Sequence, residues 1–372
     1  MSKRPPELAD LLLAWFEVHG RRNLPWQQDP TPYRVWISEV MLQQTQVETA
    51  KPYFERFIER FPDAATLAVA PLDEVLRLWS GLGYYARARN LHRGAQQVVA
   101  EHKGRLPESL DELMALPGIG RSTAGAILAL ARGQRHPILD GNVKRVLVRV
   151  FLIEDAPETT SGVRKLWEHA EACTPRTRVA AYTQAIMDLG ATVCTRANPA
   201  CDACPLRIRC RAVATGSVAR LPAPRRRAPR RLRRSHMLFV LRDGRVLLQR
   251  RPPRGIWGGL WAPPEFPEAD AARAWAAARF ANATSRAKRL PVLRHAFTHF
   301  DLDIEPWVLE TGGAAREIAE GGERWLPLAA LNTVGLPAPV ARLLKECSDG
   351  QDGSMREARP RGPRSRAPAV SG

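Results

Sequence analysis

The chain has 372 residues, of which 45% are hydrophobic and 25% charged, a globular composition that excludes a wholly disordered protein. No apolar run reaches the roughly 18 residues that a membrane helix requires, so we expect a soluble, cytoplasmic protein with no membrane partner, associated with the nucleoid if bacterial. Basic residues exceed acidic ones by 56 − 38 = 18, which favours a polyanionic partner, although the linker and tail described below hold part of this excess.

Residues 1–213 are predicted to be all-helical. Apolar side chains recur at helical spacing in segments that short loops with Pro and Gly separate, as in 8–16, 54–61 and 72–79. These segments predict an all-α domain with a substantial core.

The segment 35–46 carries a candidate carboxylate, Glu39, followed by three glutamines within four residues. Ser38 could cap a helix here, and Glu39 would then merely complement the helix dipole. The glutamines, beside Met and Leu, suit hydrogen bonds to base edges better than they suit a core. The segment is therefore a candidate nucleic-acid contact.

The sequence Leu-Pro-Gly-Ile-Gly at 116–120 lies between predicted helical stretches at 112–115 and 122–131. Two glycines spaced by one residue allow close backbone approach to an anion at a helix N-terminus, and tight helix packing is the alternative explanation. The pattern is typical of a helix-hairpin-helix motif, about 112–131, which clamps a DNA backbone.

Asp140 follows an apolar run and precedes Gly141, so it either forms a turn or presents a carboxylate beside the clamp. Two carboxylates at a sugar C–N bond can divide the work of a glycosidase. One protonates the leaving group, and the other stabilises the oxocarbenium-like centre. Glu39 and Asp140 are candidates for these roles.

Four of the six cysteines follow the spacing C-x6-C-x2-C-x5-C, namely Cys194, Cys201, Cys204 and Cys210. Thiolates this close together need a cation, and structural zinc and a [4Fe–4S] cluster are the two candidates. Only one pair has the spacing of a zinc knuckle, so the pattern favours the cluster without excluding zinc.

The composition changes near residue 215. Residues 214–235 form an Arg- and Pro-rich segment that we interpret as an extended linker. Residues 236–347 predict a small α+β domain, and 348–372 a disordered tail. The predicted elements of the α+β domain are a hairpin of strands 237–241 and 245–249 around Asp243-Gly244, a helix at 271–281, an extended segment at 291–310, a strand at 323–326 and a helix at 339–346.

Several stretches together carry a family resemblance: 24–26, 38–47, 81–91, 116–127, 139–146 and the four cysteines. On these residues the chain resembles the helix-hairpin-helix DNA glycosylases with a [4Fe–4S] cluster and, within them, the MutY-type adenine DNA glycosylases. The resemblance implies that Glu39 is the general acid at adenine N7 and that Asp140 stabilises or captures the sugar cation. It also implies that Asn142 helps to position the Asp140 carboxylate. It further implies a wedge (Tyr84), a residue of the interrogating helix (Gln44) and the cluster ligands (Cys194, Cys201, Cys204 and Cys210).

Ser122 bears on the type of reaction. Bifunctional relatives of the endonuclease III type have Lys at this position, whose amine can form a Schiff base and cut the strand. A serine cannot, so we expect a monofunctional hydrolase that removes adenine opposite 8-oxoguanine or guanine. Ser122 can also serve as a helix N-cap. The alternatives are a bifunctional glycosylase/AP lyase acting on oxidised pyrimidines and a non-catalytic DNA-binding redox sensor.

The C-terminal domain resembles the Nudix-like 8-oxoguanine-recognition domain of the same family, through 257–261 and 294–299. The resemblance implies that Phe297, Thr298 and His299 meet the damaged guanine, with Thr298 where the family more often has Ser. Residues 269–281 contain Asp270 but no Glu, so the Nudix metal-binding signature is missing and we expect binding without nucleotide hydrolysis. We expect a monomer that binds double-stranded DNA containing A:8-oxoguanine or A:G mispairs; the sequence identifies no protein partners.

Overall fold

The computed structural model describes residues 7–223, 229–280, 287–312, 318–319 and 322–349. The chain divides into two compact units. The first comprises Met1–Arg230, Arg251–Leu260 and Asn332–Gly335, and the second Arg231–Arg250, Trp261–Leu331 and Leu336–Gly372. No helix within the described ranges is both long and apolar enough to cross a membrane.

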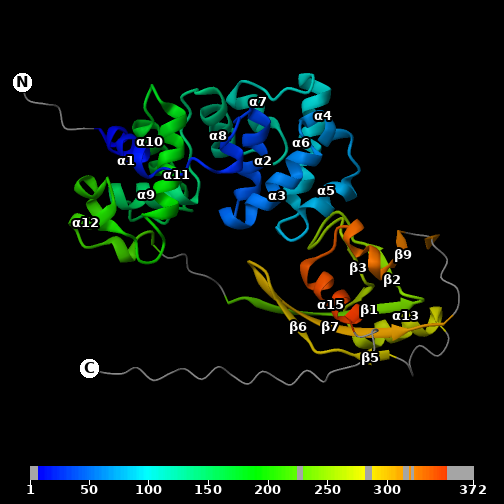
Figure 1. Ribbon diagram of the computed structural model, residues 1–372. Helices are drawn as coiled ribbons and strands as arrows, with labels where there is room; N and C mark the ends of the chain where they lie inside the picture. Colours follow the sequence, from blue (N-terminus) through cyan, green and yellow to red (C-terminus); the bar gives the residue numbers. More distant parts are fainter. Residues whose placement is uncertain (1–6, 224–228, 281–286, 313–317, 320–321, 350–372) are drawn as a thin grey trace, which may run out of the picture. The chain divides into compact units, whose positions relative to one another are not determined.

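The first unit is helical, as predicted, and Figure 1 shows its helices in blue to green. They are α1 Leu8–His19, α2 Pro32–Leu42, α3 Val47–Arg60, α4 Ala64–Val69, α5 Leu72–Trp79, α6 Ala86–His102, α7 Leu110–Ala115, α8 Arg121–Arg132, α9 Gly141–Phe151, α10 Thr160–Cys173, α11 Val179–Thr192 and α12 Arg211–Ala214. The bulky side chains of this unit with less than 2% exposure include Trp36, Trp79, Phe54, Phe57 and Phe61.

Side chains next to the helix starts explain where several helices begin. The Thr31 hydroxyl accepts a hydrogen bond from the Arg34 N–H, so α2 begins at Pro32. Ser38 therefore lies inside α2, where its hydroxyl donates to the Val35 carbonyl at 2.9 Å. The prediction that Ser38 caps a helix is wrong, because Thr31-Pro32 is the stronger start signal seven residues earlier.

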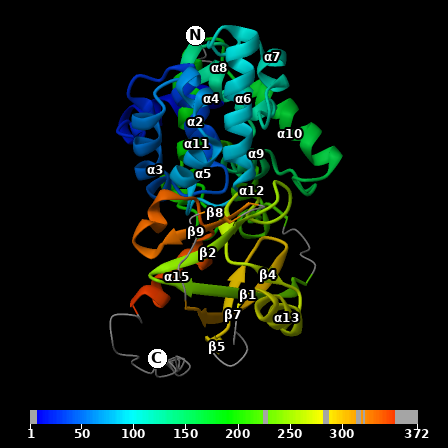
Figure 2. The same ribbon diagram turned by 90° about the vertical axis from the view of Figure 1, so that its right-hand side faces the viewer.

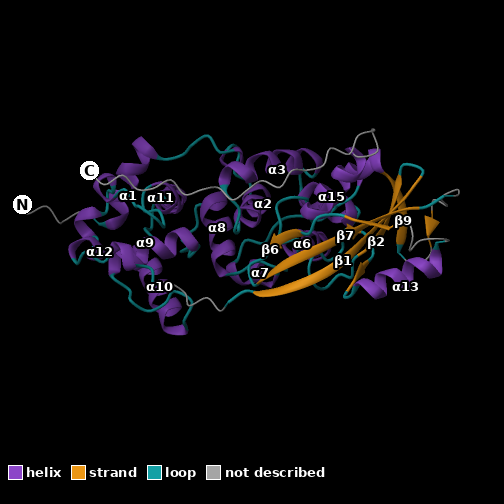
Figure 3. Cartoon of the chain, turned by 90° about the horizontal axis from the view of Figure 1, so that it is seen from below, coloured by secondary structure: helices purple, strands orange, loops and turns teal. Residues whose placement is uncertain are grey.

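The second unit is built on a nine-stranded sheet of order β5-β7-β1-β2-β9-β8, with β3 paired to β2, β4 to β1 and β6 to β7. The strands are β1 Arg231–Arg242, β2 Arg245–Arg250, β3 Trp261–Ala262, β4 Glu265–Phe266, β5 Ala287–Arg289, β6 Leu293–Ala296, β7 Phe300–Glu310, β8 Ile318–Ala319 and β9 Glu323–Pro327. Helices α13, Ala269–Arg279, and α15, Ala338–Asp349, lie on opposite faces of the sheet (Figures 2 and 3). The predicted α+β architecture and the hairpin at Asp243-Gly244 are confirmed.

The end of the predicted linker is part of the sheet. β1 begins at Arg231 and pairs in parallel with β7, with Arg231 opposite Phe300 and Leu241 opposite Glu310. Backbone pairing needs no apolar face, so the exposed arginines at 231–234 did not reveal this strand. At the other end, α15 runs to Asp349, beyond the predicted start of the tail. Residues 224–228 of the linker and 350–372 of the tail lie outside the described residues.

Candidate active site

Glu39 lies in α2, partly accessible to solvent yet surrounded by protein atoms. Burial, and then repulsion by the carboxylate of Asp140, raises the pKa of Glu39 to about 8. The repulsion means that the fold brings these two carboxylates near one another, although they are 101 residues apart in the sequence. Glu39 is therefore mostly protonated at neutral pH.

Asp140 is the N-cap residue of α9. Its Oδ1 accepts a hydrogen bond from the Val143 N–H at 2.7 Å, and its Oδ2 accepts one from Asn142 Nδ2 at 3.4 Å. Burial raises the pKa of Asp140, against the lowering by these hydrogen bonds and by the charge of Arg145. Glu39 has no comparable donors among the causes of its shift. When the pair holds one proton, we therefore assign it to Glu39.

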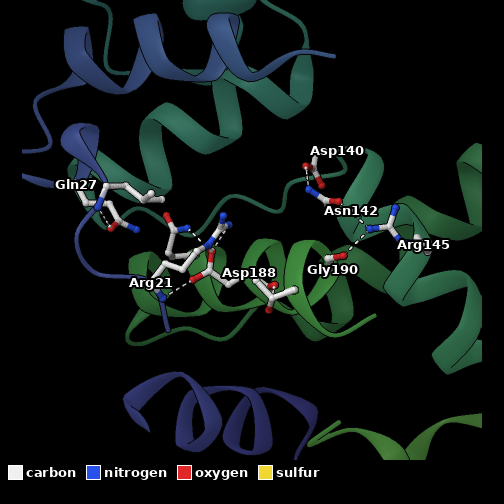
Figure 4. Close-up of polar contacts among 10 residues, drawn as sticks. Arg21, Gln27, Asp140, Asn142, Arg145, Asp188 and Gly190 are labelled. Carbon is white, nitrogen blue, oxygen red and sulfur yellow. Dashed lines mark hydrogen bonds and ion pairs between the residues drawn. The ribbon is translucent and has the colours of Figure 1, made fainter. Parts of the chain in front are cut away.

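A chain of hydrogen bonds connects Asp140 to the cysteine loop, and Figure 4 shows its first part, from Asp140 through Asn142 to Arg145. Asn142 Oδ1 accepts from Arg145 Nη2 at 2.8 Å, and Arg145 Nε donates to the Cys194 carbonyl at 2.6 Å. Arg145 Nη2 also donates to the Gly190 carbonyl. A Cβ on Gly190 would lie 2.6 Å from that of Asn142, so only glycine permits this approach of α11 to α9.

A pocket of about 290 Å³ is lined on the α2 side by Ser38, the residue before Glu39, and by Val35. Its lining residues include Trp26, Gln27, Val35, Ser38 and Gln184. Val35 lies four residues before Glu39 and so on the same face of α2. The pocket combines apolar walls with a few amide and hydroxyl groups and the side chains of Arg21 and Arg22, and apolar walls with a few polar groups are usual for a small-molecule site.

A buried ion pair supports one wall of this pocket. Arg21 donates to Asp188 through Nε at 2.9 Å, through Nη2 at 2.6 Å and through its backbone N–H at 2.8 Å (Figure 4). The Asp188 residue is 0% exposed, and Gln184 Nε2 also donates to it at 2.9 Å. These bonds fix the Gln184 amide at the pocket.

The sequence interpretation missed Gln27, Gln184 and the Arg21–Asp188 pair. Gln27 directly follows the Leu-Pro-Trp stretch that carried part of the resemblance. Gln184 and Asp188 lie one turn apart in α11, a mostly apolar helix, and this spacing could have indicated a polar site on it. The pairing of Arg21 with Asp188 spans 167 residues and had no local signal.

The hairpin at 116–120 joins α7 to α8, as predicted. Gly118 has φ +81°, and a Cβ there would lie 2.8 Å from Asn90 Nδ2, so both conformation and space require glycine. Gly120 is the N-cap of α8, and nothing lies within 4 Å of where its Cβ would be. The exposed Gly120 backbone therefore leaves room for an anion.

Ser122 is not the N-cap of α8, contrary to the suggestion from the sequence, because Gly120 holds that position. The Ser122 hydroxyl instead accepts a hydrogen bond from the Leu139 N–H at 2.9 Å. The first turn of α8 is thus tied to the residue before Asp140.

Tyr84 and Gln44 are both exposed, and both have left-handed backbones, with φ 48° and 60°. The Tyr84 residue keeps 47% of its surface exposed. Gln44 lies in the turn between α2 and α3 rather than in a helix, which corrects the expectation of an interrogating helix residue at this position. α2 ends at Leu42, two residues before it.

The four predicted ligand cysteines line one cavity, together with Arg149 and apolar residues of α9, α11 and the cysteine loop. Burial, and to a smaller extent repulsion from the other three cysteines, raises the pKa of Cys204 to about 11. A hydrogen bond from the Leu206 backbone acts in the opposite direction. Arg149 Nη1 donates to Cys194 Sγ at 3.4 Å. The fold therefore brings the four cysteines to one cavity.

In the second unit, Thr298 and His299 form the exposed turn of the β6–β7 hairpin. The Phe297 N–H donates to the Phe300 carbonyl at 2.9 Å, and the two rings stack with centroids 4.6 Å apart. The His295 ring meets Phe297 edge-on at 4.7 Å. The stacked rings hold the turn, while Thr298 and His299 face outward.

Comparisons with known proteins match both units. Residues 37–171 match the HhH-GPD superfamily base excision DNA repair protein family, and residues 236–346 match the NUDIX domain. The adenine DNA glycosylase of Buchnera aphidicola subsp. Schizaphis graminum is 36% identical over 338 residues, covering 91% of this chain and 97% of the relative. The human adenine DNA glycosylase is 32% identical over 412 residues, covering 92% of this chain and 74% of the relative.

Among solved structures, a thermostable thymine-DNA glycosylase aligns with a TM-score of 0.51 and 25% identity, covering 56% of this chain and 95% of its own. The matches to bacterial and human relatives run through both units of the chain. The matches therefore cover both the HhH-GPD region and the NUDIX region of this chain. The chain belongs to the adenine DNA glycosylase family.

Proposed function

We propose that the chain hydrolyses the N-glycosidic bond of adenine mispaired with 8-oxoguanine or guanine in double-stranded DNA. The observation that carries the proposal is the carboxylate pair, with its proton on Glu39, on the helix whose Val35 and Ser38 line a pocket with amide-bearing walls. An enzyme that acts on a base takes it out of the helix, at a cost of a few kcal/mol. The pocket lined by Val35 and Ser38 is our candidate for the extruded adenine.

In the proposed reaction, Glu39 donates its proton to the leaving base, and Asp140 stays ionised to stabilise the oxocarbenium-like sugar. The hydrogen bonds to Asp140 from Val143 and Asn142 support this second role, because they favour the charged form. Water then adds to the sugar and leaves an abasic site.

Ser122 supports a monofunctional reaction, because its hydroxyl lies at the start of the clamp helix and offers no amine for a Schiff base. The hairpin at 116–120 is the proposed phosphate clamp, and Tyr84 and Gln44 the proposed contacts to the base stack. Phe297, Thr298 and His299 are the proposed readers of 8-oxoguanine. All four side chains, Tyr84 and Gln44 in the first unit and Thr298 and His299 in the second, are exposed, which fits contacts to DNA.

The four cysteines are the proposed ligands of a [4Fe–4S] cluster. Within the described residues, no group of three or more His, Cys, Asp or Glu side chains is arranged to hold a single metal ion. The support for a cluster is that all four cysteines line one cavity, since each thiolate of a [4Fe–4S] cluster binds a different iron. Bound there, a cluster supplies a covalent cross-link of the cysteine loop. We expect about four irons per chain and visible absorbance in anaerobically purified protein, and stoichiometric zinc would contradict this.

Single-turnover assays on duplexes containing A:8-oxoguanine, A:G or an oxidised pyrimidine test the proposal. We expect adenine loss from the first two, with strand breaks only after alkali. Strand cleavage without alkali on the pyrimidine duplex would support the bifunctional alternative. Binding without any base loss would support the redox sensor.

A further inference from the structure

Arg87, the second residue of α6, has a side chain that reaches three separate segments of the chain. Its Nη1 lies 2.6 to 3.0 Å from carbonyl oxygens at the end of α2 and in the turn after it. Its Nη2 lies 3.2 to 3.4 Å from a hydroxyl of that turn and from carbonyls of the loop 81–84. The acceptors are Val40, Met41, Gln43, Thr45, Leu82 and Gly83.

The first group of acceptors belongs to the helix that carries Glu39. The last carbonyls of an α-helix lack partners within the helix, and a cation at this end also suits the helix dipole. Arg87 supplies α2 with hydrogen-bond donors for its last carbonyls and with a cation at this end, and the first acceptor, Val40, directly follows Glu39. Burial lowers the pKa of Arg87 to about 10, so its guanidinium is still charged at neutral pH. The hydrogen bonds to Val40 and Met41 are partly buried, so they are stronger than they would be at the surface.

Two acceptors of Nη2, the Leu82 and Gly83 carbonyls, belong to the loop that presents Tyr84. The Arg87 guanidinium lies 5.3 Å from the ring centroid of Trp79 and 5.6 Å from that of Tyr84. Trp79 is 0% exposed, and its Nε1 donates to the same Gly83 carbonyl at 3.1 Å. The exposed Tyr84 ring therefore lies beside a cation that the core holds in place.

We propose that Arg87 is a positioning residue that couples Tyr84 and the Gln44 turn to the helix of Glu39. Insertion of Tyr84 into the base stack and presentation of adenine to Glu39 then depend on one guanidinium. The inference rests on the proposed roles of Tyr84 and Glu39. Lysine cannot replace Arg87, because a single ammonium lacks the planar fork that reaches acceptors on several sides.

A double-mutant cycle tests the coupling, using Arg87→Lys, Tyr84→Ala and the double variant of the full-length protein. One readout is the ratio of affinities for a duplex with A:8-oxoguanine and one with A:T, in which a 2′-fluoro-substituted adenosine blocks cleavage. The other readout is the single-turnover excision rate. Arg164→Lys is the matched control, because Arg164 is exposed on α10 and paired only at 3.8 Å with Glu168.

We expect Arg87→Lys and Tyr84→Ala each to lower the affinity ratio about tenfold, and the double variant to lower it by about tenfold rather than a hundredfold, because coupled residues are non-additive. Arg87→Lys should also slow excision, whereas Arg164→Lys changes neither readout. The inference would be overturned if the two losses in affinity ratio multiplied in the double variant. It would also be overturned if Arg87→Lys left the affinity ratio unchanged. A merely structural role of Arg87 predicts multiplying effects.

Two outcomes separate this inference from the proposed function. An unchanged affinity ratio in Tyr84→Ala would refute the wedge role of Tyr84, and the coupling with it. A reduced ratio in Tyr84→Ala that multiplies with Arg87→Lys would refute only the coupling. If Arg87→Lys does not fold, Thr45→Val removes one acceptor of Arg87 and takes its place in the cycle. The same non-additivity with Tyr84→Ala is expected, with a loss of two- to threefold, and multiplying effects would again refute the coupling.

Discussion

The carboxylate site and the β6–β7 turn hold their functional side chains in opposite ways. Glu39 and Asp140 are shielded by protein, and Asp140 is fixed by donors from its own helix. Thr298 and His299 are exposed on a turn that stacked rings support from behind. Chemistry at a sugar needs pKa values set before DNA arrives, whereas a reading turn completes its environment with the DNA itself. Changes at the first site should therefore abolish activity, and changes at the second should grade a preference.

Asp140→Asn should give the largest loss, about 10² to 10⁴ in the single-turnover rate of adenine excision, because the amide carries no charge for the sugar cation. Asparagine is as good an N-cap as aspartate, so the melting temperature should stay close to that of the wild type. The rate and the melting curve of the same preparation check this. A wild-type rate would remove Asp140 from the chemistry.

Ser122→Lys should introduce a new reaction at the same site. The amine is placed at the start of the clamp helix and should form a Schiff base that borohydride traps, with strand nicking before alkali. Ser122→Ala is the control, because it also loses the hydrogen bond from Leu139, about 1 kcal/mol, without adding an amine. Equal nicking by wild type and by Ser122→Lys would contradict the monofunctional assignment.

The raised pKa of Glu39 also affects stability. Its folded pKa, about 8, lies above the ordinary 4.5, so its contribution to stability is fully present below pH 4.5 and is lost as pH rises through about 8. Denaturant unfolding between pH 5 and 9 should show the wild type losing stability relative to Glu39→Gln. Parallel pH dependences in the two proteins would mean that Glu39 ionises normally.

Thr298→Ala should have the smallest effect. One neutral hydrogen bond contributes about 0.5 to 1.5 kcal/mol, so the preference for A:8-oxoguanine over A:G should fall by about 2- to 13-fold. Excision on both duplexes at one salt concentration measures this, because so basic a protein binds any DNA at low ionic strength. If Thr298→Ala lowers the excision rate on A:G more than the rate on A:8-oxoguanine, Thr298 does not read the damaged base.

Local patterns in the sequence predicted much of the fold. Helical spacing identified α1, α3 and α5, and Asp243-Gly244 identified the β1–β2 turn. The misjudged points depend on competing or distant partners. The α2 helix begins after Thr31, at Pro32, and not at Ser38. Backbone pairing with β7 extends β1 into the arginine-rich linker.

At the site, the sequence supplied the residues, and the structure supplied their relationships. Asp140, Asn142 and Arg145 lie within six residues, so their hydrogen bonds follow from helix geometry. The continuation from Arg145 to the Cys194 carbonyl needed the tertiary fold, as did the effect of Asp140 on Glu39. Burial, and then repulsion by Asp140, raises the pKa of Glu39, and the sequence of α2 alone reveals neither cause.

The most direct test of the account is the pH dependence of single-turnover adenine excision from an A:8-oxoguanine duplex by the wild type and Glu39→Gln. If protonated Glu39 is the general acid, the wild-type rate falls as pH rises through about 8. Glu39→Gln should then bind the duplex normally and excise about 10² to 10⁴ times more slowly at every pH. Excision by Glu39→Gln at the wild-type rate, or a wild-type rate that does not change between pH 6 and 10, would contradict the central claim.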